Sequence, residues 1–199
     1  MPPAERREQL IDAALTVILE RGYSGVSIEA IARTAGVTRP VVYDHFPNLA
    51  TLLQALIERE ERYALAQLAE FVPEDPGDVE PAALFASGVR RFLDAVASRP
   101  ATWRIILLPL EGTPTIVRDH VEQNRALIQS RIEDHVRWAQ ARLGLTDSTD
   151  PVLTAWAIRS LGEEAGRAVL TDPERYPPER FEEFITPIMR RLWAPATAP

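Results

Sequence analysis

The chain has 199 residues, 46% of them hydrophobic, and a formal net charge of −7 from 29 acidic and 22 basic side chains. It has no cysteine, which excludes disulfides, a thiol nucleophile and cysteine-ligated metal sites. It has no long apolar stretch of membrane-spanning length and its N-terminus leads into no apolar signal core, so we expect a cytoplasmic protein with no membrane partner.

Three helices are predicted in the first 46 residues. Apolar residues recur at helical spacing from Ala4 to Glu20, and Gly22 follows as a stop signal. Ser27 is placed to cap a second helix, because its hydroxyl can accept a hydrogen bond from a free amide of the first turn. Gly36 then allows the left-handed backbone that a tight turn between helices requires.

The third helix has the features of a recognition helix. Thr38 is expected to cap it, and Pro40 falls in its first turn, where a missing amide has little effect. The second and third helices together form a helix-turn-helix, and we expect the segment Thr38–Asp44 to enter the major groove of DNA. The acidic overall charge does not oppose this, since phosphate contact depends on where the charges lie.

Six further helices are predicted in the rest of the chain. They are separated by loops rich in proline and glycine, and their expected ranges are about 50–71, 82–98, 101–108, 114–143, 151–171 and 178–194. No run of alternating β-branched residues predicts a convincing strand. The sequence therefore predicts an all-α chain of about nine helices.

The last two helices have unusual faces. The helix at 151–171 is rich in alanine and glycine, which let another helix approach closely. The helix at 178–194 carries an apolar stripe that something must cover: Phe181, Phe184, Ile185, Ile188 and Leu192. Packing within the chain is one answer. A four-helix bundle between two copies is the other, and it is the one that we favour.

The N-terminal residues resemble the TetR family of bacterial transcriptional regulators. The resemblance runs from about Arg7 to Leu53 and rests on these matches: Ala13-Ala14, Gly22-Tyr23, Ser27-Ile28, Ile31-Ala32, Ala35-Gly36-Val37-Thr38, Tyr43, His45-Phe46 and Leu52-Leu53. It implies a three-helix DNA-binding domain, expected at residues 1–48. It also implies a larger helical domain, expected at residues 49–199, that binds a small molecule and forms a homodimer through its last two helices.

One position departs from the family pattern. Members often have a lysine at the start of the fourth helix, where it can touch a DNA phosphate, whereas this chain has Leu49, preceded by Asn48. Asn48 and the free amides at that helix start are the candidates to replace the contact.

Seven residues are expected to contact DNA. Arg39 is the candidate for direct base reading, because a guanidinium matches O6 and N7 of guanine, and Val41 is placed to touch a thymine methyl group. Most of the others are expected to contact phosphates. The alternative is that Ser27 and Thr38 act only as helix caps and that Tyr43 and His45 pack beneath the helix. The full set is Ser27, Thr38, Arg39, Pro40, Val41, Tyr43 and His45.

The family plan implies a ligand pocket in the second domain, and local composition indicates its walls. Aromatic and aliphatic side chains with a few polar groups suit an apolar, mid-sized ligand. A role in the core is the alternative for each of them. The expected contacts are Trp103, Leu107, Asn124, Ile128, His135, Trp138, Trp156 and Glu163.

The expected function is that of a ligand-responsive repressor. Two copies would place their recognition helices in major grooves one turn apart and so read a palindromic operator. A bound ligand would favour a state in which these helices no longer fit, with the helices at 50–71 and 101–108 as levers.

Two other classes of function compete. An enzyme lacks support, because the chain has no cysteine, no His-Glu-x-x-His motif and no glycine-rich phosphate loop. No metal or cofactor is expected, since His120 and His135 share one helix without a carboxylate triad. The remaining alternative is a helical scaffold or partner-binding protein with weakened DNA binding, which the acidic charge and Leu49 favour.

Overall fold

The computed structural model describes residues 1–71, 76–108, 112–145 and 149–193. Within these ranges the chain is all-helical, so the predicted fold class is confirmed. The helices are α1 (Pro3–Arg21), α2 (Ile28–Ala35), α3 (Arg39–His45), α4 (Leu49–Phe71), α5 (Pro81–Ser98), α6 (Pro100–Leu107), α7 (Thr115–Leu143), α8 (Pro151–Thr171) and α9 (Pro178–Leu192), with a 3-10 turn at Tyr23–Gly25. None of the described helices is long and apolar enough to cross a membrane.

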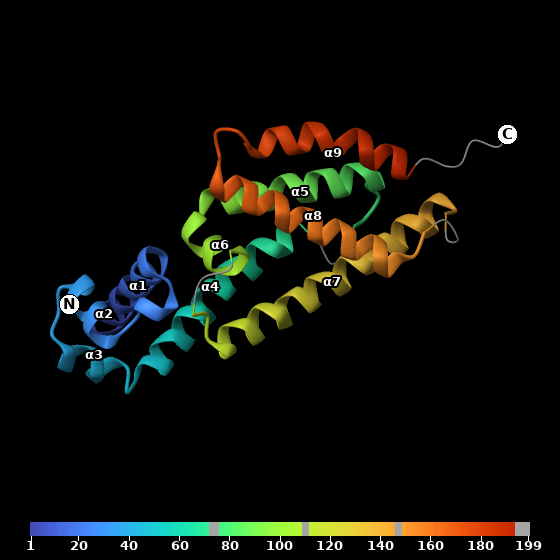
Figure 1. The fold of residues 1–199 in the computed structure, drawn as a ribbon. Coiled ribbons are helices and arrows are strands. Elements are labelled where there is room, and N and C mark those ends of the chain that lie inside the picture. Colours follow the sequence, from blue (N-terminus) through green and yellow to red (C-terminus); the bar gives the residue numbers. More distant parts are fainter. Residues whose placement is uncertain (72–75, 109–111, 146–148, 194–199) are drawn as a thin grey trace.

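The molecule is elongated, with α1–α3 at one end and the bundle of α5, α7, α8 and α9 at the other (Figure 1). Helix α4 runs from the first group into the second, and the short α6 lies beside it near the junction. Helix α5 packs against α9, and α7 packs against α8. The helical group α1–α3 and the bundle at the other end of the molecule are therefore connected by α4 and by the contacts of α6.

The turn between α2 and α3 has the expected local structure. The Ser27 hydroxyl oxygen accepts a hydrogen bond from the Ala30 amide at 3.1 Å, which caps α2. Gly36 has φ 67° and ψ 33°, the left-handed conformation that ends α2 and turns the chain. Thr38 occupies the N-cap position of α3, but its side chain makes no capping hydrogen bond, which corrects the prediction. Pro40, at one of the positions that a cap bonds, has no N–H to donate.

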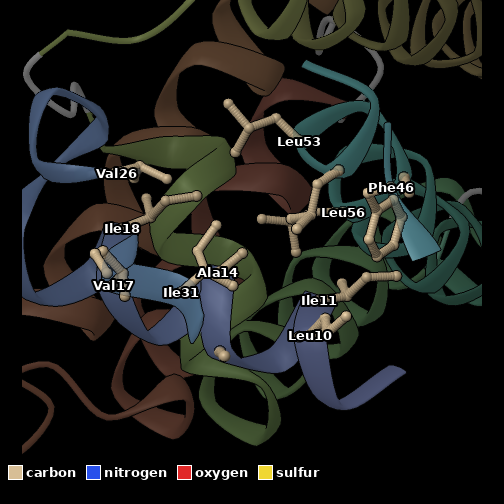
Figure 2. Close-up of a cluster of buried hydrophobic side chains, with 14 of the residues drawn as sticks. Leu10, Ile11, Ala14, Val17, Ile18, Val26, Ile31, Phe46, Leu53 and Leu56 are labelled. Atoms are coloured by element: carbon tan, nitrogen blue, oxygen red, sulfur yellow. The ribbon is translucent and has the colours of Figure 1, made fainter. Parts of the chain in front are cut away.

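A packed apolar core holds the first end together. Figure 2 shows side chains of α1, α2 and α4 converging with Phe46, the residue that follows α3. Ten of the buried members are Leu10, Ile11, Ala14, Val17, Ile18, Val26, Ile31, Phe46, Leu53 and Leu56. Burial of this many aliphatic side chains fixes the angle between α2 and α3.

The first core does not end at residue 48. It continues along α4 as far as Ile57 and takes in Ile105 from α6 and Val117 from α7. The loop before α7 also abuts this end, because a Cβ on Gly112 (φ 73°) would lie 2.9 Å from the Ser24 amide nitrogen. The boundary at 48/49 stays a prediction; the packing ties both parts of the chain together across it.

The outer faces of α8 and α9 carry large apolar side chains that this single chain leaves exposed. On α8 the inward face consists largely of small residues, and a Cβ on Gly166 would lie 2.8 Å from Leu107. Several larger apolar residues of α8 and α9 face outward. The exposed set is Val152, Leu153, Trp156, Leu161, Phe184, Ile188 and Leu192.

Candidate DNA-binding surface and ligand cavity

Helix α3 presents one face to the core and the other to the outside. Val42 is fully buried and so is Phe46, immediately after the helix. Tyr43 is 46% exposed, so it does not pack beneath the helix. The predicted DNA contacts Ser27, Thr38, Arg39 and Pro40 are also exposed, and Val41 and His45 are half-buried. The seven residues thus lie on α3 and at the start of α2, on the accessible side of the helix-turn-helix.

The surroundings of α3 fix its position. The Arg7 guanidinium lies over the Phe46 ring, 4.8 Å from its centroid. Gln9 on α1 donates a hydrogen bond to the Ala35 carbonyl at the end of α2, with a nitrogen–oxygen distance of 2.9 Å. Both contacts connect α1 to the helix-turn-helix, which keeps the outward face of α3 in a defined orientation.

The start of α4 explains the departure at residue 49. Leu49 is half-buried and packs against the first core, so it cannot take the place of a phosphate-binding lysine. The side-chain oxygen of Asn48 accepts hydrogen bonds from the amide and the hydroxyl of Thr51, at 2.9 and 3.0 Å. Asn48 therefore acts as a helix cap, and its side-chain NH₂ remains the group that can face a phosphate.

A cavity of about 150 Å³ lies between α4, α5, α6, α7 and α8. Its wall is mainly aliphatic and aromatic, with contributions such as Leu65, Phe92 and Ile132. Six of the eight residues predicted from the sequence line it: Trp103, Leu107, Asn124, Ile128, His135 and Glu163. The structure thus brings together residues from three helices that are far apart in the chain.

Two predicted pocket residues lie elsewhere. Trp156 is 56% exposed on the outer face of α8, because the small residues of that helix occupy its inward face. Trp138 packs against the buried cluster that contains Met189 and Trp193, and the Arg142 guanidinium lies 5.8 Å from its ring centroid. Their expected positions in the cavity wall were therefore wrong.

Charged groups on α7 and α8 line one side of the cavity. One oxygen of Glu163 accepts hydrogen bonds from Arg125 Nε at 3.2 Å and Arg159 Nη1 at 2.6 Å. Arg159 also donates to Gln129 at 3.0 Å. These charges are paired with one another, as buried and half-buried charges must be.

Three other polar atoms of the cavity walls have no hydrogen-bond partner in the described structure. They are Glu61 Oε1, Trp103 Nε1 and His135 Nε2, and all three are shielded from water. The second oxygen of Glu61 lies 3.1 Å from His120 Nδ1, and His135 Nδ1 lies 2.8 Å from the Arg131 carbonyl oxygen. Buried polar atoms without partners are few in native proteins, so their concentration at one cavity is informative.

A buried polar network that no sequence pattern predicts joins the two ends of the molecule. Arg59 on α4 is 7% exposed, and its Nη1 donates to Asp12 at 2.7 Å and to Glu8 at 3.1 Å, both on α1. Its Nε donates to Glu60 at 2.9 Å. The other oxygen of Glu60, which is 3% exposed, accepts a hydrogen bond from the Thr102 hydroxyl of α6 at 2.5 Å.

The network is electrostatically consistent. Burial alone would lower the pKa of the Arg59 guanidinium, but hydrogen bonds to Asp12, Glu60 and Glu8 outweigh it and raise that pKa above its ordinary value. Thr102 is the neighbour in sequence of Trp103, which lines the cavity. Arg59 and Glu60 thus form a continuous polar path from the helix beside the cavity to the first helix of the DNA-binding end.

A metal centre is not among the arrangements that the described residues form. No three histidine, aspartate or glutamate side chains come together there in a way that would hold an ion. His120 pairs with Glu61, and His135 lies in the cavity wall.

Known proteins resemble this chain in sequence. The family model for bacterial regulatory proteins of the tetR family matches residues 10–56. The HTH-type transcriptional activator FasR of Mycolicibacterium smegmatis is 42% identical over 59 residues, which are 30% of this chain and 27% of FasR. The nucleoid occlusion factor SlmA of Vibrio vulnificus is 27% identical over 188 residues, which cover 91% of this chain and 92% of SlmA.

The likeness also extends to the fold. The crystal structure of the transcriptional regulator FadR from Bacillus subtilis in complex with stearoyl-CoA superposes with a TM-score of 0.69 at 18% identity, over 92% of this chain and 96% of that one. The matched N-terminal segment contains α2, α3 and most of the core that supports them. Residues 10–56 therefore match the N-terminal segment of the bacterial regulatory proteins of the tetR family, and the fold of the whole chain is that of the transcriptional regulator FadR.

Proposed function

We propose that the protein reads a palindromic operator as a homodimer and leaves it when a small apolar molecule enters the cavity. The observation that carries this proposal is the pairing of an exposed α3 face with a separate apolar cavity, connected by α4 and α6. Residues 1–48 would form the DNA-binding domain and residues 49–199 the ligand-binding and dimerisation domain. The protein would work in the cytoplasm, where the chromosome is.

The DNA contacts follow from chemistry and exposure. Arg39 stands at the start of α3, where recognition helices meet base edges, and its guanidinium can pair with a guanine. Tyr43 is exposed one turn later and can donate its hydroxyl hydrogen to a phosphate. Val41 would meet a thymine methyl group, while Ser27, Thr38, Pro40 and His45 would lie along the backbone.

The homodimer rests on the uncovered faces of α8 and α9. Large apolar residues such as Leu153, Leu161 and Phe184 are exposed there, and exposed apolar residues in such number normally mark an interface. Two copies that face each other through these helices would form a four-helix bundle. A symmetric pair also matches the symmetry of a palindromic operator.

The effector would be an apolar molecule. The cavity wall supports this, and the fold neighbour FadR is named in complex with stearoyl-CoA. A volume of about 150 Å³ is smaller than the several hundred Å³ that bind mid-sized ligands, so the effector must push the walls apart. Trp103 and Leu107 of α6 would move when it does.

The network around Arg59 would transmit that movement. Displacing α6 separates the Thr102 hydroxyl from Glu60 and leaves a buried carboxylate with fewer partners. Arg59 holds that carboxylate and α1 at the same time, so the position of the first helix depends on the position of α6. A ligand that prefers the displaced α6 thereby shifts the population away from the DNA-binding state.

Repression is the direction that we propose, although the relative FasR is named an activator. A second candidate function rests on the relative SlmA, whose likeness covers most of both chains and which is named a nucleoid occlusion factor. In that case the protein would bind DNA and act on a partner protein. Transcription from a promoter that contains the selected site separates the two, because only a transcriptional regulator changes it.

The test is selection of bound sequences from random DNA by the purified protein. We expect enrichment of a palindrome with half-sites about 34–36 Å apart, one helical turn. Absence of enrichment at low salt with folded protein would contradict sequence-specific reading and favour the partner-binding alternative. Affinity for the selected site should also fall as salt rises, since phosphate contacts release counterions.

A further inference from the structure

We infer that the cavity takes an uncharged, elongated lipophilic alcohol, and that Glu61 and Trp103 select it over a fatty acid of the same length. The inference rests on the proposed function only in treating this cavity as the effector site. It adds the chemical class of the effector and the residues that set it.

The shape and wall of the cavity require a long apolar body. On α7 the lining extends from Val121 to His135, about 21 Å at 1.5 Å per residue. Between these ends the wall consists of residues such as Ile128, Phe85 and Phe92. A compact polar molecule would leave most of this apolar surface in contact with water.

The unpaired polar atoms define the ends of the ligand. Trp103 Nε1–H can only donate, so it requires an acceptor. The Arg131 carbonyl can only accept, which places the hydrogen of His135 on Nδ1 and leaves Nε2 of the neutral ring as an acceptor. Glu61 Oε1 is a third site without a partner, and as a carboxylate oxygen it requires a donor. A hydroxyl group can accept from Trp103 Nε1–H and donate its one hydrogen to Glu61 Oε1, and the second hydroxyl of a diol can donate to His135 Nε2.

A carboxylate at the same place would be rejected. It has no hydrogen to offer to Glu61 or to His135 Nε2, and it would bring a second negative charge beside the Glu61 carboxylate. The arginines on the other side do not offset this, because Arg125 and Arg159 already share the carboxylate of Glu163. An anion would have to displace that residue from both of them.

These atoms are covered by the surrounding helices. Trp103 is 3% exposed and His135 is 7% exposed, so a ligand reaches them only when the walls separate. The α8 wall has a place to accommodate it, because nothing lies within 4 Å of a Cβ built on Gly162. Pairing of groups that lack partners favours the opened, occupied form.

The experiment is calorimetric titration of the full chain with three probes of equal length: 1-dodecanol, 1,12-dodecanediol and dodecanoate. We expect 1-dodecanol and the diol to bind at least about tenfold more tightly than dodecanoate, which corresponds to about 1.4 kcal/mol. Glu61→Gln should tighten dodecanoate and reduce that gap, whereas Glu58→Gln, an exposed position on the same helix, should leave it unchanged.

A second pair of variants tests the donor. Trp103→Phe should weaken 1-dodecanol about fivefold or more, because it removes the only hydrogen that the indole can donate. Trp193→Phe is the matched control, since its indole nitrogen is also buried without a partner among the described residues. Trp193 does not itself line the cavity, and its ring stacks on the wall residue Phe85. If Trp103→Phe fails to fold, the comparison of the alcohols with dodecanoate on the unmodified chain and on Glu61→Gln still tests the inference.

Equal or tighter binding of dodecanoate would overturn the inference, and so would the absence of binding of all three probes. The same titrations in the presence of operator DNA test the proposed function separately from this inference. Preference for the alcohols without release of DNA would leave the inference intact and contradict the proposed coupling. Release of DNA by dodecanoate alone would support the proposed function and contradict the inference.

Discussion

The two ends of α4 lie in different kinds of surroundings. Near its start, Leu52 and Leu56 are fully buried in a continuous core, whereas Leu65 farther along lines a cavity. Among the described residues, the buried side-chain polar atoms without partners follow the same division. One of them, the Tyr23 hydroxyl, lies at the DNA-binding end, and the others belong to Glu61, Gln67, Trp103, His135 and Trp193.

The difference shows what each end requires. A surface that must fit successive major grooves needs a fixed angle between helices, and close packing supplies it. A site that responds to a ligand must become more stable when the ligand binds. Open space and polar atoms without partners allow this, because the ligand can fill the space and pair the atoms. The Arg59 network lies where the two regimes meet.

Truncation of a leucine at each end of α4 should show the largest difference between the packed core and the cavity. We expect Leu52→Ala to lower the free energy of unfolding by about 3–5 kcal/mol, because it opens a hole in a packed core. Leu65→Ala only enlarges an existing cavity and should lower it by less than about 2 kcal/mol. Urea denaturation followed by circular dichroism gives both values. Equal losses would mean that the two ends are packed alike.

Removal of Arg59 tests whether the network holds the two ends together. Arg59→Met leaves the carboxylate of Glu60 buried without its main partner, and we expect a loss of about 3–5 kcal/mol in the free energy of unfolding. Arg62→Met, an exposed arginine of the same helix, should change it by less than about 0.5 kcal/mol. A loss of similar size in both variants would show that charge on α4 matters and the network does not.

The buried Tyr23 hydroxyl, which lies at the DNA-binding end, should make the free energy of unfolding fall at high pH. Burial raises the pKa of Tyr23 to about 12, against about 10 when unfolded. A raised pKa favours the protonated native form, so this stability is present below about pH 10 and is lost as the pH rises toward 12. The full loss is about 3 kcal/mol, because each unit of pKa difference between the two states corresponds to about 1.36 kcal/mol.

The variant Tyr23→Phe isolates that effect. It also removes a buried hydroxyl that has no partner, so its stability near pH 8 should equal or exceed that of the original chain. Because the chain has no lysine and no cysteine, few other groups titrate in this range. Urea denaturation at pH 8, 10 and 11 compares the two proteins. Parallel losses in both would assign the pH dependence to other groups.

The smallest change tests the contact between α6 and α4. Thr102→Val keeps the shape of the side chain but removes the hydroxyl that donates to Glu60, and we expect a loss of about 1–3 kcal/mol in the free energy of unfolding. DNA affinity of the ligand-free protein should fall with it, although α3 is untouched. Thr171→Val, whose hydroxyl bonds only carbonyls of its own helix, is the control. Unchanged DNA affinity would remove Thr102 from the coupling path.

Local signals made much of the fold predictable from the sequence. Ser27 and Gly36 determine the ends of α2 by capping and by backbone conformation, which are properties of neighbouring residues. The helix ranges followed from apolar spacing and from proline and glycine breaks. The missing cap at Thr38 is consistent with a local effect, since Pro40 removes one of the two amide donors that the hydroxyl could bond.

The misplaced tryptophans and the missed network have a different cause. Helix α8 has apolar residues on two faces, and which face turns inward depends on how closely α5 and α6 approach Gly166, so Trp156 was assigned to the wrong side. Arg59 and Glu60 look like ordinary surface charges in the sequence. Their partner Thr102 is far along the chain, and only the packing of α6 on α4 brings it near.

The most direct test of the account is the effect of Arg39→Ala on two DNA duplexes, the selected operator and a scrambled sequence of the same length. We predict that the variant binds the operator about 1–3 kcal/mol more weakly and relaxes the preference at one base pair, with little change on scrambled DNA. Tyr43→Phe, which removes a phosphate contact, should weaken both duplexes alike. Equal weakening of both duplexes by Arg39→Ala would contradict base reading by α3.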